Sequence, residues 1–114
     1  MIHLDIKPLS VNQAWQGRRF KTPAYKQYAR SLGLILPKNL LIPEGDLSIR
    51  LRFGFSNKQS DWDNPIKAFQ DVVCTYYGIN DNRIYMALVE KVLTKKGREF
   101  VQFEFYKYQG ENNV

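Results

Sequence analysis

The chain has 114 residues, with one cysteine, one histidine and a formal net charge of +6 at neutral pH. This length suits one domain with its own hydrophobic core and excludes a two-domain enzyme. Hydrophobic residues make up 44% and charged residues 25%, which is typical of a folded globular protein and not of a disordered or fibrous one. The excess of positive charge favours a polyanionic partner, with nucleic acid first and a membrane surface second.

The shortage of cysteine and histidine limits the chemistry further. Cys74 and His3 cannot build a zinc site of the Cys/His type, and no disulfide within the chain is possible. No apolar run approaches the ~18 residues of a membrane helix, and the first residues do not have the pattern of a signal peptide. The glycine spacing matches no dinucleotide or P-loop fingerprint. We therefore expect a cytoplasmic protein with no membrane partner and no nucleotide cofactor.

The hydrophobic pattern predicts an α+β fold. Alternating apolar residues indicate strands, and apolar residues at helical spacing indicate helices. The expected order is a strand at 2–7, a loop at 9–22, a helix at 23–36, a strand at 46–55, a helix at about 64–77, a strand at 83–94, a hairpin turn at 95–97 and a strand at 101–106. This order predicts a single small domain over residues 1–114, with a largely antiparallel or mixed four-stranded sheet and two main helices. Residues 110–114 are expected to form a frayed tail.

The positive charge is concentrated in the first half of the chain. Residues 1–60 contain ten basic and three acidic residues, whereas residues 61–114 contain seven basic and eight acidic ones. The segment 15–30 has five basic residues and no acid, interleaved with aromatic residues that more often belong to a core than to a base-stacking surface. The expected DNA-binding residues are Arg18, Arg19, Lys21 and Lys26, together with Asn12.

The most informative segment is the acidic run from Asp61 to Asp63, before the second long helix. Two carboxylates two positions apart on a non-helical segment can point to the same side, and Mg²⁺ or Mn²⁺ prefers such oxygen ligands. Lys67 and Asp71 follow at intervals of four on one helix face, where the lysine can meet a scissile phosphate. Trp62, between the two aspartates, is expected to pack beneath the loop and hold both carboxylates in place.

Each of these residues also has a purely structural interpretation. Asp63 or Asn64 can cap the helix that follows, and Asp61 can be a solvated loop residue. Lys67 and Asp71 can form a surface ion pair of little consequence. Taken one at a time, these interpretations are the more common. Taken together with the excess of positive charge, the cluster favours a functional site.

The same residues resemble a known family. The pattern Asp61-x-Asp63-Asn64-x-x-Lys67-x-x-x-Asp71, followed by Asp81-x-x-Ile84, resembles the RusA-type Holliday junction resolvases, which are small endodeoxyribonucleases often encoded by phages and prophages. The segment Pro8-x-Ser10-x-Asn12, ahead of a basic region, is similar to the usual opening of that family. The resemblance spans roughly residues 4–107.

The resemblance implies a RusA-like fold and a homodimer that resolves four-way DNA junctions by paired, symmetric nicks in recombination and repair. It implies Mg²⁺ as the cofactor, with Mn²⁺ as a substitute. It also implies that the protein acts in the cytoplasm of a bacterial host cell. By position, Asp61, Asp63 and Asp81 would be the catalytic metal ligands and Lys67 the catalytic lysine, with Asp71 and Asn64 in supporting roles. The chain departs from the family at Asn80-Asp81, where members often have two acidic residues.

The predicted helix raises a geometric difficulty for this site. A helix over 64–77 would be about 20 Å long, so Asp81 beyond its far end should not easily reach Asp63 near its start. Either the helix ends early and the chain doubles back, or the site is assembled across a dimer two-fold. Two other functions stay open: a non-catalytic basic DNA-binding protein of phage origin, and a phage structural or assembly protein.

Overall fold

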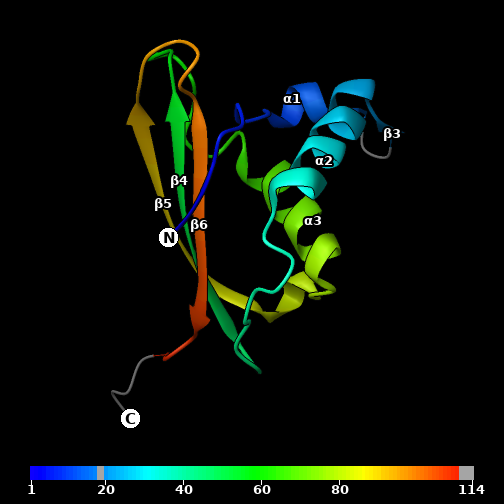
Figure 1. The fold of residues 1–114 in the computed structure, drawn as a ribbon, viewed down its shortest axis with the longest axis vertical. Coiled ribbons are helices and arrows are strands. Elements are labelled where there is room, and N and C mark those ends of the chain that lie inside the picture. Colours follow the sequence, from blue (N-terminus) through cyan, green and yellow to red (C-terminus); the bar gives the residue numbers. More distant parts are fainter. Residues whose placement is uncertain (18–19, 111–114) are drawn as a thin grey trace.

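The computed structural model describes residues 1–17 and 20–110. Arg18 and Arg19, both expected to bind DNA, lie outside the described residues, as does the predicted frayed tail from residue 111 onward. The elements are β1 Ile2–Leu4, α1 Val11–Ala14, β2 Trp15–Gln16, β3 Phe20–Lys21, α2 Pro23–Ile35, β4 Leu47–Phe55, α3 Ile66–Tyr77, the 3₁₀ turn η1 Asp81–Arg83, β5 Ile84–Leu93 and β6 Phe100–Lys107 (Figure 1).

Four strands form one sheet in the order β1-β6-β4-β5. β4 pairs with β5 in parallel and with β6 antiparallel, and β1 pairs antiparallel with the other side of β6. The parallel pair is possible because α3 returns the chain to the end of the sheet where β4 begins, and β5 starts there. The α+β domain with a four-stranded mixed sheet and two main helices is confirmed.

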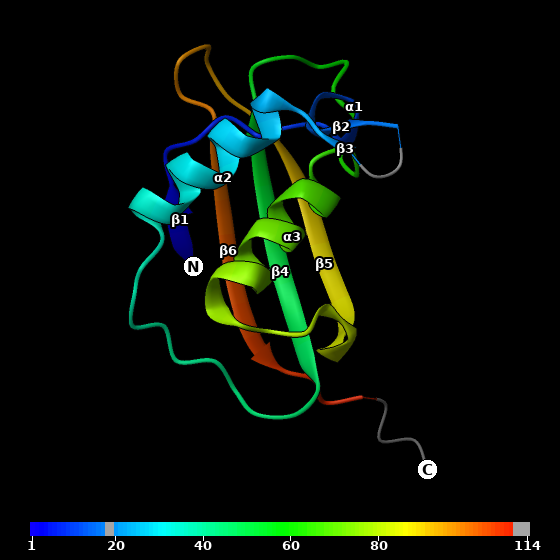
Figure 2. The same cartoon turned by 90° about the vertical axis from the view of Figure 1, so that its right-hand side faces the viewer.

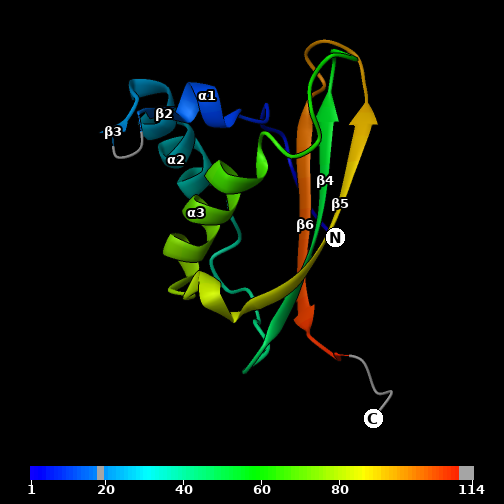
Figure 3. The ribbon, with the colours of Figure 1, turned by 180° about the vertical axis from the view of Figure 1, so that it is seen from behind.

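The two long helices cover one face of the sheet. Figures 1 and 3 show the sheet edge-on with α2 and α3 on the same side, and Figure 2 shows α3 lying over β4. The core between the layers contains Phe53, Phe69 and Phe103, all fully buried. Phe69 meets both sheet residues edge-on, with ring centroids 6.2 Å from Phe53 and 5.4 Å from Phe103. This packing holds the start of α3 against the sheet.

The long elements lie close to where the sequence pattern predicts them. Thr22 caps α2 by accepting a hydrogen bond from the Tyr25 N–H, and Pro23 occupies the first turn. The apolar positions of the helix are buried as expected, except for Ile35, which is exposed. The segment 95–97 forms a tight turn, closed by the Arg98 N–H donating to the Lys95 carbonyl with Gly97 at φ 88°. The prediction that it is a hairpin turn is wrong, because β4 lies between β5 and β6 in the sheet.

Two further local predictions are wrong. The segment expected to be a loop at 9–22 contains α1 and the two-stranded ribbon of β2 and β3. Ser10 and Gln13 form a reciprocal capping box around α1, and an element this short has no apolar period to reveal it. The second long helix begins at Ile66, and neither Asp63 nor Asn64 caps it, since Pro65 occupies the cap position. Within the described ranges, no helix is long and apolar enough to cross a membrane.

Candidate metal and nucleic-acid site

The acidic segment forms a compact turn between β4 and α3. The Asn64 N–H donates to the Asp61 carbonyl at 3.4 Å, and the Ile66 N–H donates to the Asp63 carbonyl at 3.2 Å. The Asn64 carbonyl in turn accepts a hydrogen bond of 2.9 Å from the Val11 N–H at the start of α1. The first helix therefore braces the acidic turn, because its first N–H is not needed within the helix.

The loop that leads into this turn is tied to β5. The ammonium of Lys91 donates to the carbonyl of Lys58 at 2.6 Å and to the carbonyl of Ser60. At the end of β5, the Thr94 N–H donates to the Phe55 carbonyl at 2.8 Å. These contacts fix the polar loop after β4 beside the carboxyl end of β5, and Asp61 follows directly.

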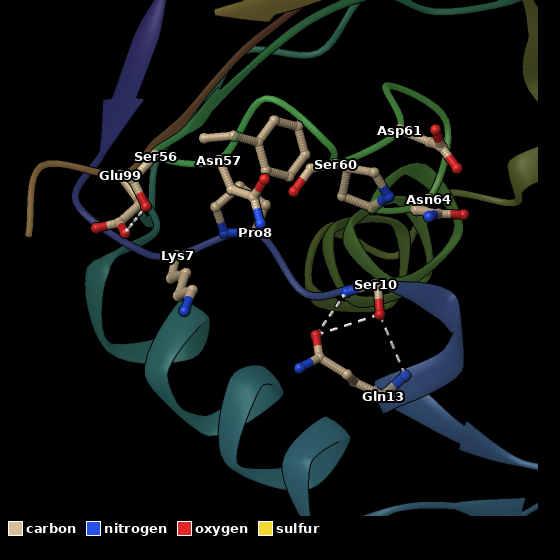
Figure 4. Close-up of a pocket in the computed structure, with 12 residues that line it drawn as sticks. Lys7, Pro8, Ser10, Gln13, Ser56, Asn57, Ser60, Asp61, Asn64 and Glu99 are labelled. Atoms are coloured by element: carbon tan, nitrogen blue, oxygen red, sulfur yellow. Dashed lines mark hydrogen bonds between the residues drawn. The ribbon is translucent and has the colours of Figure 1, made fainter. Parts of the chain in front are cut away.

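A polar pocket of about 390 Å³ opens beside the acidic turn. Figure 4 shows Asp61 and Asn64 at one end of this pocket and Glu99 at the other, with Lys7 and Ser10 along the wall formed by the N-terminal segment. The complete lining is Lys7, Pro8, Ser10, Gln13, Phe55, Ser56, Asn57, Ser60, Asp61, Asn64, Pro65 and Glu99.

Glu99 is a charged residue of this pocket that sequence reasoning missed. Hydrogen bonds from its own backbone N–H, the Ser56 hydroxyl and the Gly97 N–H hold the pKa of the Glu99 carboxyl below its usual value, with a smaller contribution from Lys7. The Ser56 hydroxyl donates at 2.8 Å across 43 positions of sequence. A residue next to a tight turn carries no local signal for such a contact.

The two aspartates of the turn are exposed to solvent. Neither carboxylate has a hydrogen bond or an ion pair with any residue that the structure describes. Trp62 between them is 54% exposed, so the expectation that it packs beneath the loop is wrong. The turn is held by its backbone contacts instead, which leave both carboxylates and the indole free on the surface. Carboxylate oxygens are ligands that a hard divalent cation prefers, and of the two aspartates Asp61 lines the pocket whereas Asp63 does not.

Lys67 lies in the first turn of α3 with its ammonium 5.4 Å from the centre of the Trp15 ring. Asp71, one turn later, accepts a hydrogen bond from the Tyr25 hydroxyl, and its carboxylate lies 3.8 Å from the ammonium of Lys21. The structure therefore gives Asp71 partners on α2 and β3, instead of a surface pair with Lys67. Asp71 connects the basic segment to the helix that carries Lys67.

Asp81 lies far from the other two proposed metal ligands within one chain. It is in η1, just before Ile84, which pairs with Leu47 at the start of β4, whereas Asp61 follows the end of β4. The intervening helix α3 has 12 residues and is about 18 Å long. The alternative in which this helix ends early is thus wrong. Over residues 1–17 and 20–110, no three His, Cys, Asp or Glu side chains are grouped to hold a metal ion.

Of the remaining DNA-binding candidates, only Asn12 lies on an element with a hydrogen bond to the acidic turn among the described residues. Asn12 is exposed on α1, which contacts the turn, and Lys26 is exposed on α2. Lys21 on β3 lies 4.9 Å from the centre of the Tyr25 ring, next to Asp71. Phe20, beside Lys21, is 74% exposed. Tyr25 and Tyr28 are buried, in line with the expectation that these aromatics belong to the core.

Comparison with models of known protein families gives no match, and no curated protein matches the sequence.

Proposed function

We propose that the protein is a metal-dependent, structure-specific endodeoxyribonuclease that resolves four-way DNA junctions in recombination and repair. The observation that carries the proposal is a pair of exposed carboxylates, Asp61 and Asp63, that have no partner among the described residues. They lie on a braced turn that leads into α3, the helix of Lys67. The net charge of +6 supports a polyanionic substrate. A pure DNA-binding surface gains nothing from two exposed carboxylates, since they repel phosphates unless a cation lies between. We place this activity in the cytoplasm of a bacterial cell, with a phage or prophage gene as one source.

Asp61 and Asp63 would hold the metal ion, which is Mg²⁺ or, in its place, Mn²⁺. The bound ion would neutralise negative charge on the phosphate and would lower the pKa of the water bound to it. Lys67 meets the charge that builds on the scissile phosphate, and Trp62 contacts the nucleotide beside it. Lys21, Lys26, Arg18, Arg19 and Asn12 bind the backbone of the DNA arms, while Asn64 keeps the turn closed and Asp71 keeps Lys21 beside α3.

The third carboxylate requires a second subunit. Asp81 lies at the opposite end of α3 from Asp63, so a site that uses both aspartates takes them from different copies of the chain. A homodimer with two such shared sites also suits the two symmetric cuts that a four-way junction needs.

The test uses a synthetic four-way junction and a linear duplex, each with and without Mg²⁺. We expect symmetric nicking of the junction only, and only with the metal. Asp63→Asn should bind the junction but not cut it. Glu104→Gln, at an exposed position on β6 and away from both the turn and Asp81, is the matched control and should cut normally. Absence of metal-dependent cleavage by the unmodified protein would overturn the proposal.

Shared sites are tested by mixing two inactive variants, Asp63→Asn and Asp81→Asn. A mixed dimer has one site in which both aspartates are intact, so nicking should reappear at a fraction of the unmodified rate. If the mixture stays as inactive as its parents, each site lies within one subunit. An Asp81→Asn parent that cuts normally would show that Asp81 has no catalytic role.

A non-catalytic DNA-binding protein is the second candidate function. It is favoured by the lack of a three-ligand metal group within the described part of a single chain. In that case the protein would bind the linear duplex as tightly as the junction and cut neither.

A further inference from the structure

Lys67 faces an aromatic ring and not a carboxylate. Its side chain is exposed on α3, and its ammonium lies 5.4 Å from the centre of the Trp15 ring. This distance is within the range of about 6 Å over which the face of a ring attracts an ammonium group. Asp71 has the helical spacing for an ion pair with Lys67, but its carboxylate is taken by Tyr25 and Lys21. Among the described residues, Lys67 forms no ion pair.

The kind of partner matters for what this lysine can do. A carboxylate beside an ammonium group would offset the positive charge that a phosphate meets. The face of an indole ring carries only a partial negative charge, so it attracts the ammonium group without cancelling its charge. A lysine held in this way keeps its position and still presents its full charge. A group that stabilises charge on a reacting phosphate needs both properties.

The ring of Trp15 is itself fixed by its backbone and by its neighbours. Trp15 ends α1, where its N–H donates to the Val11 carbonyl, and it pairs with Lys21 in the ribbon of β2 and β3. The half-buried indole packs against the core and lies 5.1 Å from the ring of Tyr25, between ring centroids. A ring fixed in this way can restrict a flexible side chain that lies on its face.

The short helix α1 relates this ring to the acidic turn. At its start, the Val11 N–H donates to the Asn64 carbonyl of the turn at 2.9 Å. At its end, Trp15 faces Lys67. One element of four residues thus contacts both the turn that carries the two candidate metal ligands and the lysine of the same site.

We propose that Trp15 is a positioning residue, whose indole ring holds the ammonium of Lys67 toward a phosphate at the acidic turn. This inference rests on the proposed function, because it assigns a catalytic use to Lys67. Trp15 acts through the lysine and not on the phosphate itself. Weakening the ring should therefore lower the rate of cleavage but leave the affinity for the junction unchanged, since that affinity depends on many phosphate contacts.

The contact is tested by NMR without DNA or metal. Protons above the face of an aromatic ring resonate upfield, so the ε-methylene signal of Lys67 should lie upfield of the other lysine signals. Lys67→Met identifies this signal by removing it. Trp15→Leu should return the signal to the position of the other lysines, whereas Trp62→Leu, at the second tryptophan of the chain, should leave it upfield. A Lys67 signal that lies among the others in the unmodified protein would overturn the inference.

Fluorinated tryptophan separates the charge of the ring from its shape. Fluorine atoms withdraw electrons from the ring face and weaken its attraction for an ammonium group, while the ring stays in its place. In Trp62→Phe, Trp15 is the only position that incorporates the analogue. We expect tetrafluorotryptophan there to lower kcat for junction nicking with Mg²⁺ about fivefold. The dissociation constant of the junction and the Tm should stay the same. The matched control is Trp62→Phe with ordinary tryptophan.

The outcomes distinguish this inference from the proposed function. Equal kcat values in the two proteins, with junction cleavage intact, would overturn the role of Trp15 and leave the proposed function standing. A fall in kcat with an equal loss of junction affinity would also overturn it, because the ring would then shape the binding surface. If the unmodified protein cuts no junction, the proposed function fails and the catalytic role of Trp15 fails with it, while an upfield Lys67 signal would still establish the contact.

Discussion

The Tyr25 hydroxyl donates a hydrogen bond to the Asp71 carboxylate, which joins α2 to α3 across 46 positions of sequence. Burial, and then the hydrogen bond and charge of Asp71, raise the pKa of Tyr25. The tyrosine therefore stays a protonated donor at neutral pH. Lys21 approaches the same carboxylate, so this contact positions the basic segment beside the helix that carries Lys67.

Removal of this hydrogen bond should destabilise the protein. We expect Tyr25→Phe to lower the free energy of unfolding by about 1–2 kcal/mol, measured by urea denaturation, because Asp71 loses a donor in a partly buried place. Tyr28→Phe is the matched control on the same helix. The Tyr28 hydroxyl is buried without a partner in the described structure, so its removal should be neutral or stabilising. Equal losses in the two variants would contradict this role for Asp71.

Gly54 should tolerate no side chain. A Cβ at this position in β4 would lie 2.4 Å from ring atoms of Phe100 on the neighbouring strand β6. We expect Gly54→Ala to cost about 2 kcal/mol of stability, because the ring must move within a packed sheet. Gly33→Ala in α2 meets open space and should stabilise the protein by about 0.5–1 kcal/mol through helix propensity. Thermal melts of the two variants should shift in opposite directions.

Lys91→Met should loosen the loop that precedes the acidic turn. The substitution keeps a long side chain but removes both hydrogen bonds to the loop carbonyls. We expect faster amide hydrogen exchange over residues 56–64 and, under the proposed function, cleavage reduced at least about tenfold with junction binding retained, because the aspartates are less well positioned. Lys95→Met, at an exposed turn position, is the control. Unchanged exchange over 56–64 would show that Lys91 does not hold this loop.

Stability should fall at alkaline pH. Burial raises the pKa of Cys74 from 9.0 to about 11 and that of Tyr77 from 10.0 to about 12. Both groups favour their protonated forms in the folded state, so their contribution is complete below pH 9 and is lost as the pH rises through 11 and 12. The midpoint of urea unfolding should thus decline above pH 9.

Tyr77→Phe isolates one part of this decline. The Tyr77 hydroxyl donates to the Pro37 carbonyl at 2.6 Å, so the variant is less stable at neutral pH but lacks one group that titrates. The fall in unfolding midpoint between pH 10 and 12 should be smaller than in the unmodified protein. If the unfolding midpoint of Tyr77→Phe falls between pH 10 and 12 by as much as that of the unmodified protein, Tyr77 does not contribute to the pH dependence.

Local sequence patterns determined the long elements and the position of the acidic turn. A helix or strand with one buried face repeats its apolar residues with a fixed period, and residues such as Pro23 and Gly78 mark helix ends through their own backbone preferences. The pair Asp61 and Asp63 was recognisable for the same reason, since the two aspartates are separated by a single residue and their relationship is local. The short helix α1 has too few residues to show a period and was missed.

The tertiary structure alone decided which distant residues meet. Glu99 joins the pocket of Asp61 through the turn that leads into β6, Asp71 is taken by Tyr25, and Asp81 is carried to the opposite end of the sheet by the length of α3. Such contacts depend on how helices and strands pack, and packing is set by the whole buried surface and not by any local period. For this reason the sequence alone could indicate the acidic residues of a candidate site, but only the fold could show that one chain does not bring Asp81 to the other two.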